Sequence, residues 1–78
     1  MSRLPIISTK DVVRVLKRAG FTYAPKRGKG SHIAFYKVDE NGRKCLVIVP
    51  HRRDIPKGTL MSIIEQSGLT KDDFIALL

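Results

Sequence analysis

The chain has 78 residues and a formal charge of +8, from 15 Lys and Arg against seven Asp and Glu. At this size an unaided hydrophobic core supplies only about 3 to 5 kcal/mol of net stability, which argues against a deep cleft with a multi-part active site. The charge is concentrated in residues 1–37, which hold nine basic residues and one acid, whereas residues 38–78 hold six of each. This uneven distribution of positive charge favours a polyanionic partner, either nucleic acid or an acidic protein. The alternative is that the charge serves only solubility.

The sequence also constrains the compartment and the use of metals. It contains no apolar run of the roughly 18 residues that span a bilayer, and its first residues have too short an apolar stretch for a signal peptide. The single cysteine, Cys45, leaves no internal disulfide, and no Cys or His pair has the spacing of a zinc site. We therefore expect one soluble domain over residues 1–78, in the reducing cytoplasm, with no membrane contact and no metal or other cofactor.

The first predicted element is a helix that starts at Ser8. Its apolar residues recur with helical spacing, and Lys and Arg occupy the other side. The apolar set is Val12, Val13, Val15, Leu16 and Ala19. Ser8 followed by Asp11 predicts a capping box, and Gly20 predicts a left-handed stop. The segment should form an amphipathic helix with a basic outer face.

Three strands should follow. Residues 21–26 predict a short first strand, and Pro25 marks it as an edge strand or marks its end. The glycine-rich basic stretch 26–30 predicts a loop. Residues 31–38 alternate, so Ile33 and Phe35 should face one side of the sheet and His32, Ala34 and Tyr36 the other. Residues 39–42, Asp-Glu-Asn-Gly, predict a hairpin turn. The return strand, residues 43–50, is apolar on both faces, which leaves one apolar row without an evident cover; either it is a modestly apolar surface or a partner covers it.

Two helices complete the chain. One should begin near Pro56 or Thr59 and end at Gly68, and a short one should follow a second capping box, Thr70 with Asp73. The predicted fold class is α+β in the order α-β-β-β-α-α, with a three-stranded antiparallel sheet covered on one face by helices.

Four segments together resemble the HicA family of toxin mRNA interferases. They are "LKRAGF" at 16–21, "GSHIAF" at 30–35, "VPHRRD" at 49–54 and "PKGTLMSIIEQSGL" at 56–69. The element order also looks like that of the double-stranded-RNA-binding fold. The resemblance implies metal-free cleavage of mRNA by the histidine of the Gly-Ser-His motif, here His32, and neutralisation by a HicB antitoxin. Many relatives carry a second histidine directly after the first, whereas this chain has Ile33.

The residues around His32 suit that chemistry. Metal-free RNA scission needs a proton acceptor for the ribose 2′-hydroxyl, a proton donor for the departing 5′-oxygen, and positive charge at the phosphate; histidine suits either proton role. The preceding loop supplies cations, and its glycines allow close approach of a phosphate. The predicted RNA-binding residues are Lys26, Arg27, Gly28, Lys29, Gly30 and Ser31, with Tyr36, His51, Arg52 and Arg53 as additional contacts. His51 has three possible roles: a second proton donor, a phosphate contact or a strand-end residue.

Two other functions fit the same sequence. The chain could be an RNA-binding module without catalysis, in which His32 is a surface histidine on a strand. It could also be a structural adaptor for an acidic protein, which would explain the charge but give "GKGSH" no role. RNA cleavage in the presence of EDTA separates the nuclease from both.

Overall fold

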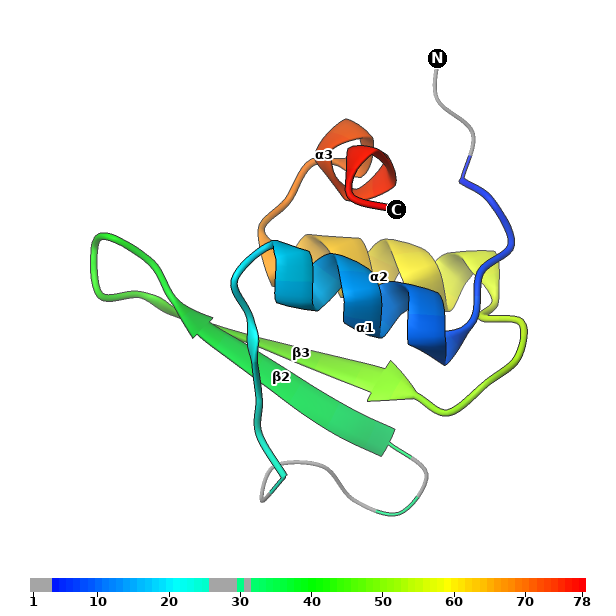
Figure 1. The fold of residues 1–78 in the computed structure, drawn as a ribbon, viewed down its shortest axis with the longest axis horizontal. Helices are drawn as coiled ribbons and strands as arrows, with labels where there is room; N and C mark the ends of the chain where they lie inside the picture. The colour runs from blue at the N-terminus through cyan, green and yellow to red at the C-terminus, as the bar shows by residue number, and fades with distance from the viewer. Residues whose placement is uncertain (1–3, 26–29, 31) are drawn as a thin grey trace.

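The computed structural model describes residues 4–25, 30 and 32–78; residues 1–3, 26–29 and 31 lie outside it. The elements follow the predicted order of one helix, three strands and two helices. Figure 1 draws and labels all of them except the two-residue first strand. They are α1 (Thr9–Arg18), β1 (Thr22–Tyr23), β2 (His32–Val38), β3 (Lys44–Pro50), α2 (Lys57–Ser67) and α3 (Lys71–Ala76). The predicted α+β class with a three-stranded antiparallel sheet is confirmed.

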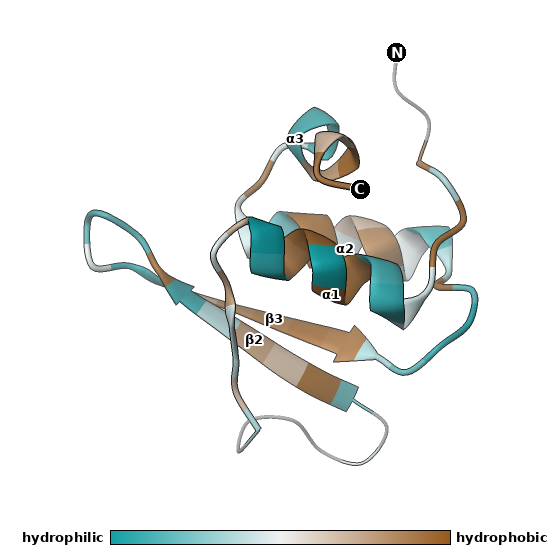
Figure 2. Ribbon diagram, viewed as in Figure 1, coloured by the Kyte–Doolittle hydropathy of each residue, from teal (hydrophilic) through white to brown (hydrophobic). Residues whose placement is uncertain are grey.

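The helices form a layer over one face of the sheet. Helices α1 and α2 lie side by side on that face, and α3 packs on the side of the helix layer that is away from the sheet (Figure 1). One continuous core joins the layers, with fully buried side chains from α1 (Leu16), β3 (Val47), α2 (Leu60) and α3 (Phe74). Figure 2 shows the result on α1, where hydrophilic residues occupy the outward surface.

Helix α1 begins and ends where the sequence predicts. The Ser8 hydroxyl accepts a hydrogen bond from the Asp11 N–H, and the Asp11 carboxylate accepts one from the Ser8 N–H at 3.0 Å. Both bonds of the predicted capping box are therefore present. After Arg18 the chain leaves the helix through Gly20, whose φ of 93° is costly for any residue with a Cβ. The Lys37 ammonium then donates to the Ala19 carbonyl at 2.7 Å and so covers the end of the helix.

The first strand is shorter than predicted. Only Thr22 and Tyr23 pair with β2, because Phe21 still belongs to the end of α1: its N–H donates to the Leu16 carbonyl, and its side chain is buried in the core. After Tyr23, one more bond runs from the Ala24 N–H to the Ala34 carbonyl. Pro25, which has no N–H, then ends the pairing.

In the hairpin of β2 and β3, the side chains lie on the predicted faces of the sheet. His32 lies opposite Pro50, Ala34 opposite Ile48 and Tyr36 opposite Leu46, on the face away from Ile33 and Phe35. At the turn, the Asp39 carboxylate accepts hydrogen bonds from the Asn41 and Arg43 N–H groups, which explains why Asp-Glu-Asn-Gly closes the hairpin. Ala34 nevertheless is fully buried, so the outer face is not uniformly exposed.

The last two helices have the predicted boundaries. Helix α2 follows Pro56 and ends at Gly68, whose φ of 75° is the expected left-handed cap. Helix α3 begins after Thr70, whose hydroxyl accepts from the Asp73 N–H at 3.0 Å; this is one of the two bonds of the predicted capping box.

Candidate functional site

His32 is the first residue of β2, and its side chain is exposed. It stands on the outer face of the sheet at the end where β3 finishes, because its ladder partner is Pro50. The sequence predicted this face. It did not predict that α2, which packs along the free edge of β3, forms a wall beside the same histidine.

A groove of about 360 Å³ lies between this end of the hairpin and α2. The sheet contributes His32, Ile48 and Pro50; Arg52 follows the sheet, and α2 contributes Thr59, Ser62, Ile63 and Gln66. Among the described residues, the polar groups of the lining are an imidazole, a guanidinium, two hydroxyls and an amide, and none of them is an Asp or Glu side chain. The Ser62 hydroxyl already donates to the Gly58 carbonyl at 3.2 Å. The Arg52 guanidinium supplies positive charge and donors, which suit an anionic ligand.

The polar wall of α2 is the part of the site that the sequence analysis missed. Thr59, Ser62 and Gln66 recur with spacings of three and four, which places them on one side of the helix next to the buried stripe of Leu60 and Ile64. The spacing of these polar residues can be read from the sequence and indicates a polar side of the helix. It does not identify a site, because no local pattern indicates that this side of α2 adjoins His32.

Arg52 reaches the groove because α1 holds the chain just after β3. The Thr9 N–H donates to the Arg52 carbonyl at 3.0 Å, and the Arg52 N–H donates to the Thr9 hydroxyl oxygen at 2.7 Å. The hydroxyl itself donates to the Pro50 carbonyl at 2.6 Å. These bonds involve only the main chain of Arg52, so its guanidinium is available to line the groove.

The structure separates Arg52 from its neighbours in sequence. His51 and Arg53 line a different depression, beside Ser8 and Lys10 at the start of α1, although Arg52 also borders it. Of the residues predicted as additional RNA contacts, only Arg52 therefore shares the groove with His32.

Tyr36 is also outside the groove. It lies four residues along β2 from His32, about 13 Å away at the usual rise of a strand. It borders a second pocket, of about 430 Å³, together with Ala24, Lys44, Cys45 and Leu46. On the outer face, the apolar row predicted on the third strand consists of Leu46, which is 41% exposed, and Ile48, which is half-buried. Tyr36 and Val38 of β2 lie beside Leu46 and are 40% and 50% exposed, so the three form an open apolar row.

The basic loop can be placed only in part. Lys26, Arg27, Gly28, Lys29 and Ser31 lie outside the described residues. Gly30 is described and has a φ of 59°, a backbone conformation that favours glycine.

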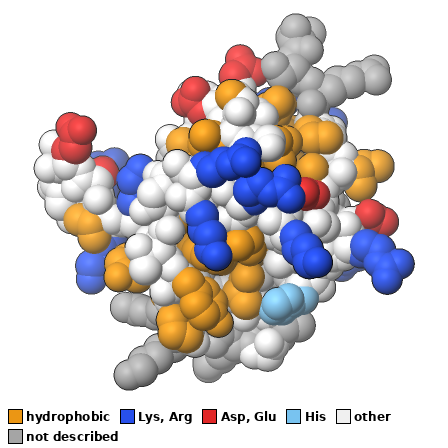
Figure 3. All heavy atoms as spheres, viewed as in Figure 1, with side chains coloured by type: hydrophobic (Ala, Val, Ile, Leu, Met, Phe, Trp, Pro, Cys, Tyr) orange, Lys and Arg blue, Asp and Glu red, His pale blue; other side chains and the backbone are white. Residues whose placement is uncertain are grey.

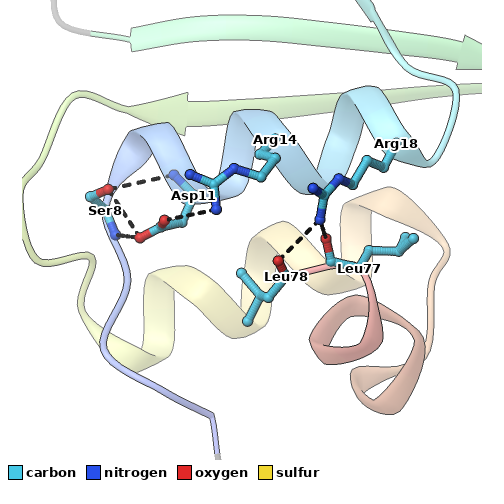
Figure 4. A network of polar contacts seen from close by, with 6 residues as sticks. All are labelled: Ser8, Asp11, Arg14, Arg18, Leu77 and Leu78. Carbon is cyan, nitrogen blue, oxygen red and sulfur yellow. Dashed lines mark hydrogen bonds and ion pairs between the residues drawn. The ribbon is translucent and has the colours of Figure 1, made fainter.

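A second basic surface lies on α1. Lys10, Arg14, Lys17 and Arg18 are exposed, and Figure 3 shows Lys and Arg side chains in a band across the face that α1 occupies. Figure 4 shows that some of these charges have partners. Arg14 pairs with Asp11 at 3.7 Å, and the Arg18 guanidinium donates to the Leu77 and Leu78 carbonyls at 2.8 and 3.0 Å. Arg18 thus fastens the end of α3 to α1.

The pKa of the Asp11 carboxyl lies below its ordinary value. The hydrogen bond from the Ser8 N–H, and then the bond from its hydroxyl, lower the pKa of the Asp11 carboxyl. Within the described part of the chain, no three His, Cys, Asp or Glu side chains are grouped closely enough to hold a metal ion.

The sequence matches the model of a family described as HicA toxin of bacterial toxin-antitoxin systems over residues 9–69. This match runs from the start of α1 to just beyond α2 and includes both walls of the groove. The chain belongs to the HicA toxin family. It is accordingly a toxin of a toxin–antitoxin system, and such a toxin has a cognate antitoxin. All four segments that carried the resemblance lie within the matched residues. No match was found among curated proteins.

None of the helices that the structure describes is long and apolar enough to cross a membrane (Figure 1).

Proposed function

We propose that this HicA toxin is a metal-independent endoribonuclease that cleaves mRNA in the cytoplasm, with His32 as its general acid/base. The observation that carries the proposal is the position of His32: an exposed imidazole at a groove that also holds the Arg52 guanidinium and, among the described residues, no carboxylate. Cleavage of a cellular polymer is consistent with membership of a toxin family.

The proposed reaction uses the RNA's own 2′-hydroxyl. His32 accepts the proton of this hydroxyl, the 2′-oxygen attacks the adjacent phosphorus, and the bond to the 5′-oxygen of the next nucleotide breaks. The leaving oxygen takes a proton from solvent, so the products are a 2′,3′-cyclic phosphate and a 5′-hydroxyl. Arg52 balances the charge that develops on the phosphate. One general acid/base group contributes typically about 10²- to 10⁴-fold, which is a modest rate but enough to harm a cell.

The RNA approaches His32 from the basic loop in this proposal. Residues 26–31 precede the histidine directly in sequence, and their cations and glycine N–H groups suit backbone phosphates. Tyr36, His51 and Arg53 then contact more distant parts of the RNA, since none of them lines the groove.

The proposed antitoxin is a HicB-type acidic protein that covers the outer face of the sheet. Tyr36, Val38 and Leu46 form an open apolar row on the same face as His32, so one partner would bury the row and block the histidine. A stable protein–protein interface buries about 800 Å² on each partner. On a protein of this size, the interface would therefore extend well beyond the apolar row. The charge of +8 would speed association with an acidic partner.

Cleavage of a defined mRNA in excess EDTA tests the activity. We expect continued cleavage, with new ends that carry 2′,3′-cyclic phosphate and 5′-hydroxyl groups. A preparation that binds the RNA but leaves it intact would show an RNA-binding module without catalysis. Activity that EDTA abolishes and Mg²⁺ restores would contradict the metal-independent mechanism.

A further inference from the structure

Gln66 lies in the last turn of α2, on the wall of the groove that faces His32. Its side-chain oxygen Oε1 accepts a hydrogen bond from the Ile48 N–H at 3.0 Å. Strand β3 is an edge strand, whose N–H groups point alternately toward β2 and out of the sheet. The Ile48 N–H points out, toward its acceptor on α2, and so takes its partner from outside the sheet. The bond joins α2 to the sheet at the position where the groove forms.

The bond also determines how the amide of Gln66 is oriented. A backbone N–H can pair only with the oxygen of a side-chain amide, so Oε1 is the amide atom that faces the Ile48 N–H and Nε2 is left for another partner. Within the described part of the chain, the Gln66 side chain makes no other hydrogen bond. Gln66 is exposed, and it lines the groove together with His32 and Arg52. Its two N–H donors are therefore held by the protein but used by none of the described residues.

We propose that Gln66 is a substrate-contacting residue whose Nε2 group donates a hydrogen bond to a non-bridging oxygen of the phosphate that is cleaved. The inference rests on the proposed nuclease function, and it adds a residue to that site. A phosphate is the expected acceptor because the groove also holds the Arg52 guanidinium, a cation that can only donate hydrogen bonds and that attracts an anionic ligand. A neutral donor that is already oriented stabilises developing charge without reorganising during the reaction.

The alternative is that Gln66 only joins α2 to β3, and two substitutions separate the roles. Gln66→Glu keeps an oxygen that can accept from the Ile48 N–H but removes both N–H donors. Gln66→Met removes the acceptor and the donors and introduces no charge. If Gln66 contacts the phosphate, both variants should lower the single-turnover cleavage rate by about 10²- to 10³-fold, the loss typical of one oriented donor. If it is only structural, folded Gln66→Met should cleave at close to the parent rate, and only Gln66→Glu should be slow, because its carboxylate repels the RNA phosphates whichever role is correct.

A binding measurement keeps the test valid if a variant is less stable. A non-cleavable RNA with a 2′-deoxy sugar at the mapped cleavage site is compared with the same RNA carrying a methylphosphonate there, which lacks one phosphate oxygen. The parent protein should bind the methylphosphonate RNA more weakly, and folded Gln66→Met should show a smaller difference. An equal difference in parent and variant would overturn the contact. Failure of the parent protein to cleave any RNA would instead contradict the nuclease function, so the two failures are distinguishable.

Discussion

His32 is exposed at the start of β2, so its removal should affect chemistry far more than folding. We expect His32→Ala to lower RNA cleavage by at least about 10²-fold and to abolish growth arrest. The free energy of unfolding should change by no more than about 0.5 kcal/mol, as is usual for surface positions. Cleavage assays and thermal unfolding on the same preparation measure both. A folded variant that cuts at the parent rate would refute the catalytic role, and loss of folding would show a structural one.

Arg52 and Arg53 form a matched pair, because they are adjacent in sequence but only Arg52 lines the groove with His32. We expect Arg52→Gln to lower the cleavage rate at saturating RNA, whereas Arg53→Gln should mainly weaken binding. Each lost phosphate contact should reduce the slope of log affinity against log salt by about 0.7 for single-stranded RNA. The Thr9 bonds to the main chain of Arg52 remain in the variant, so its fold should be retained. If Arg52→Gln and Arg53→Gln changed the cleavage rate at saturating RNA equally, this would argue against a role for the groove.

At the scale of single elements, the capping box makes the stability of α1 depend on pH. The pKa of Asp11 is lower in the folded protein than its ordinary value of 3.8, chiefly because of the bond from the Ser8 N–H. A lowered folded-state pKa stabilises the protein above the unfolded value, and this stabilisation is lost as the pH falls through the folded value. We expect Asp11→Asn to be less stable than the parent at pH 7 and the difference to shrink below about pH 3.8. Urea unfolding between pH 7 and pH 2.5 measures it, and a difference that stays constant with pH would contradict the assignment.

Ser8 provides a control for the same element. Ser8→Ala removes the hydroxyl that accepts from the Asp11 N–H but keeps the Ser8 N–H that donates to the carboxylate. We expect a loss of about 1 kcal/mol in the free energy of unfolding at pH 7, the usual cost of an N-cap hydroxyl. Since the larger cause of the lowered pKa remains, the decline at low pH should persist in this variant.

At the scale of the whole molecule, the open apolar row predicts where the antitoxin binds. Leu46 on the outer face and Met61 on α2 are 41% and 42% exposed, so they are matched in accessibility but differ in position. We expect Leu46→Asp to weaken antitoxin binding by about 30-fold or more, because it places a charge in a buried apolar contact. Met61→Asp should have little effect.

Hydrogen exchange on the toxin–antitoxin complex gives an independent readout of the same surface. We expect added protection in residues 32–38 and 44–49. Protection confined to the helices, together with equal effects of the two substitutions, would show that the antitoxin inhibits from a distance.

The elements themselves could be predicted from the sequence because their signals are local. Ser8 with Asp11 and the glycines at 20 and 68 mark helix boundaries through hydrogen bonds and backbone angles that span only a few residues. Strict alternation in β2 likewise predicts which side chains share a face with His32. The first strand was overestimated because Phe21 has strand propensity, but its burial and its bond to Leu16 keep it with the helix.

The groove was decided by the tertiary structure. His32, Arg52 and Gln66 are far apart in sequence, and no local pattern relates them. They meet because the hairpin register brings Pro50 beside His32, Thr9 holds the main chain of Arg52, and Gln66 joins α2 to the unpaired N–H of Ile48. The sequence by itself determined that a histidine would stand on an open face of the sheet next to a basic loop. Which donors surround it depends on how α2 satisfies the hydrogen-bonding groups of an edge strand, and that requirement arises only after the sheet has formed.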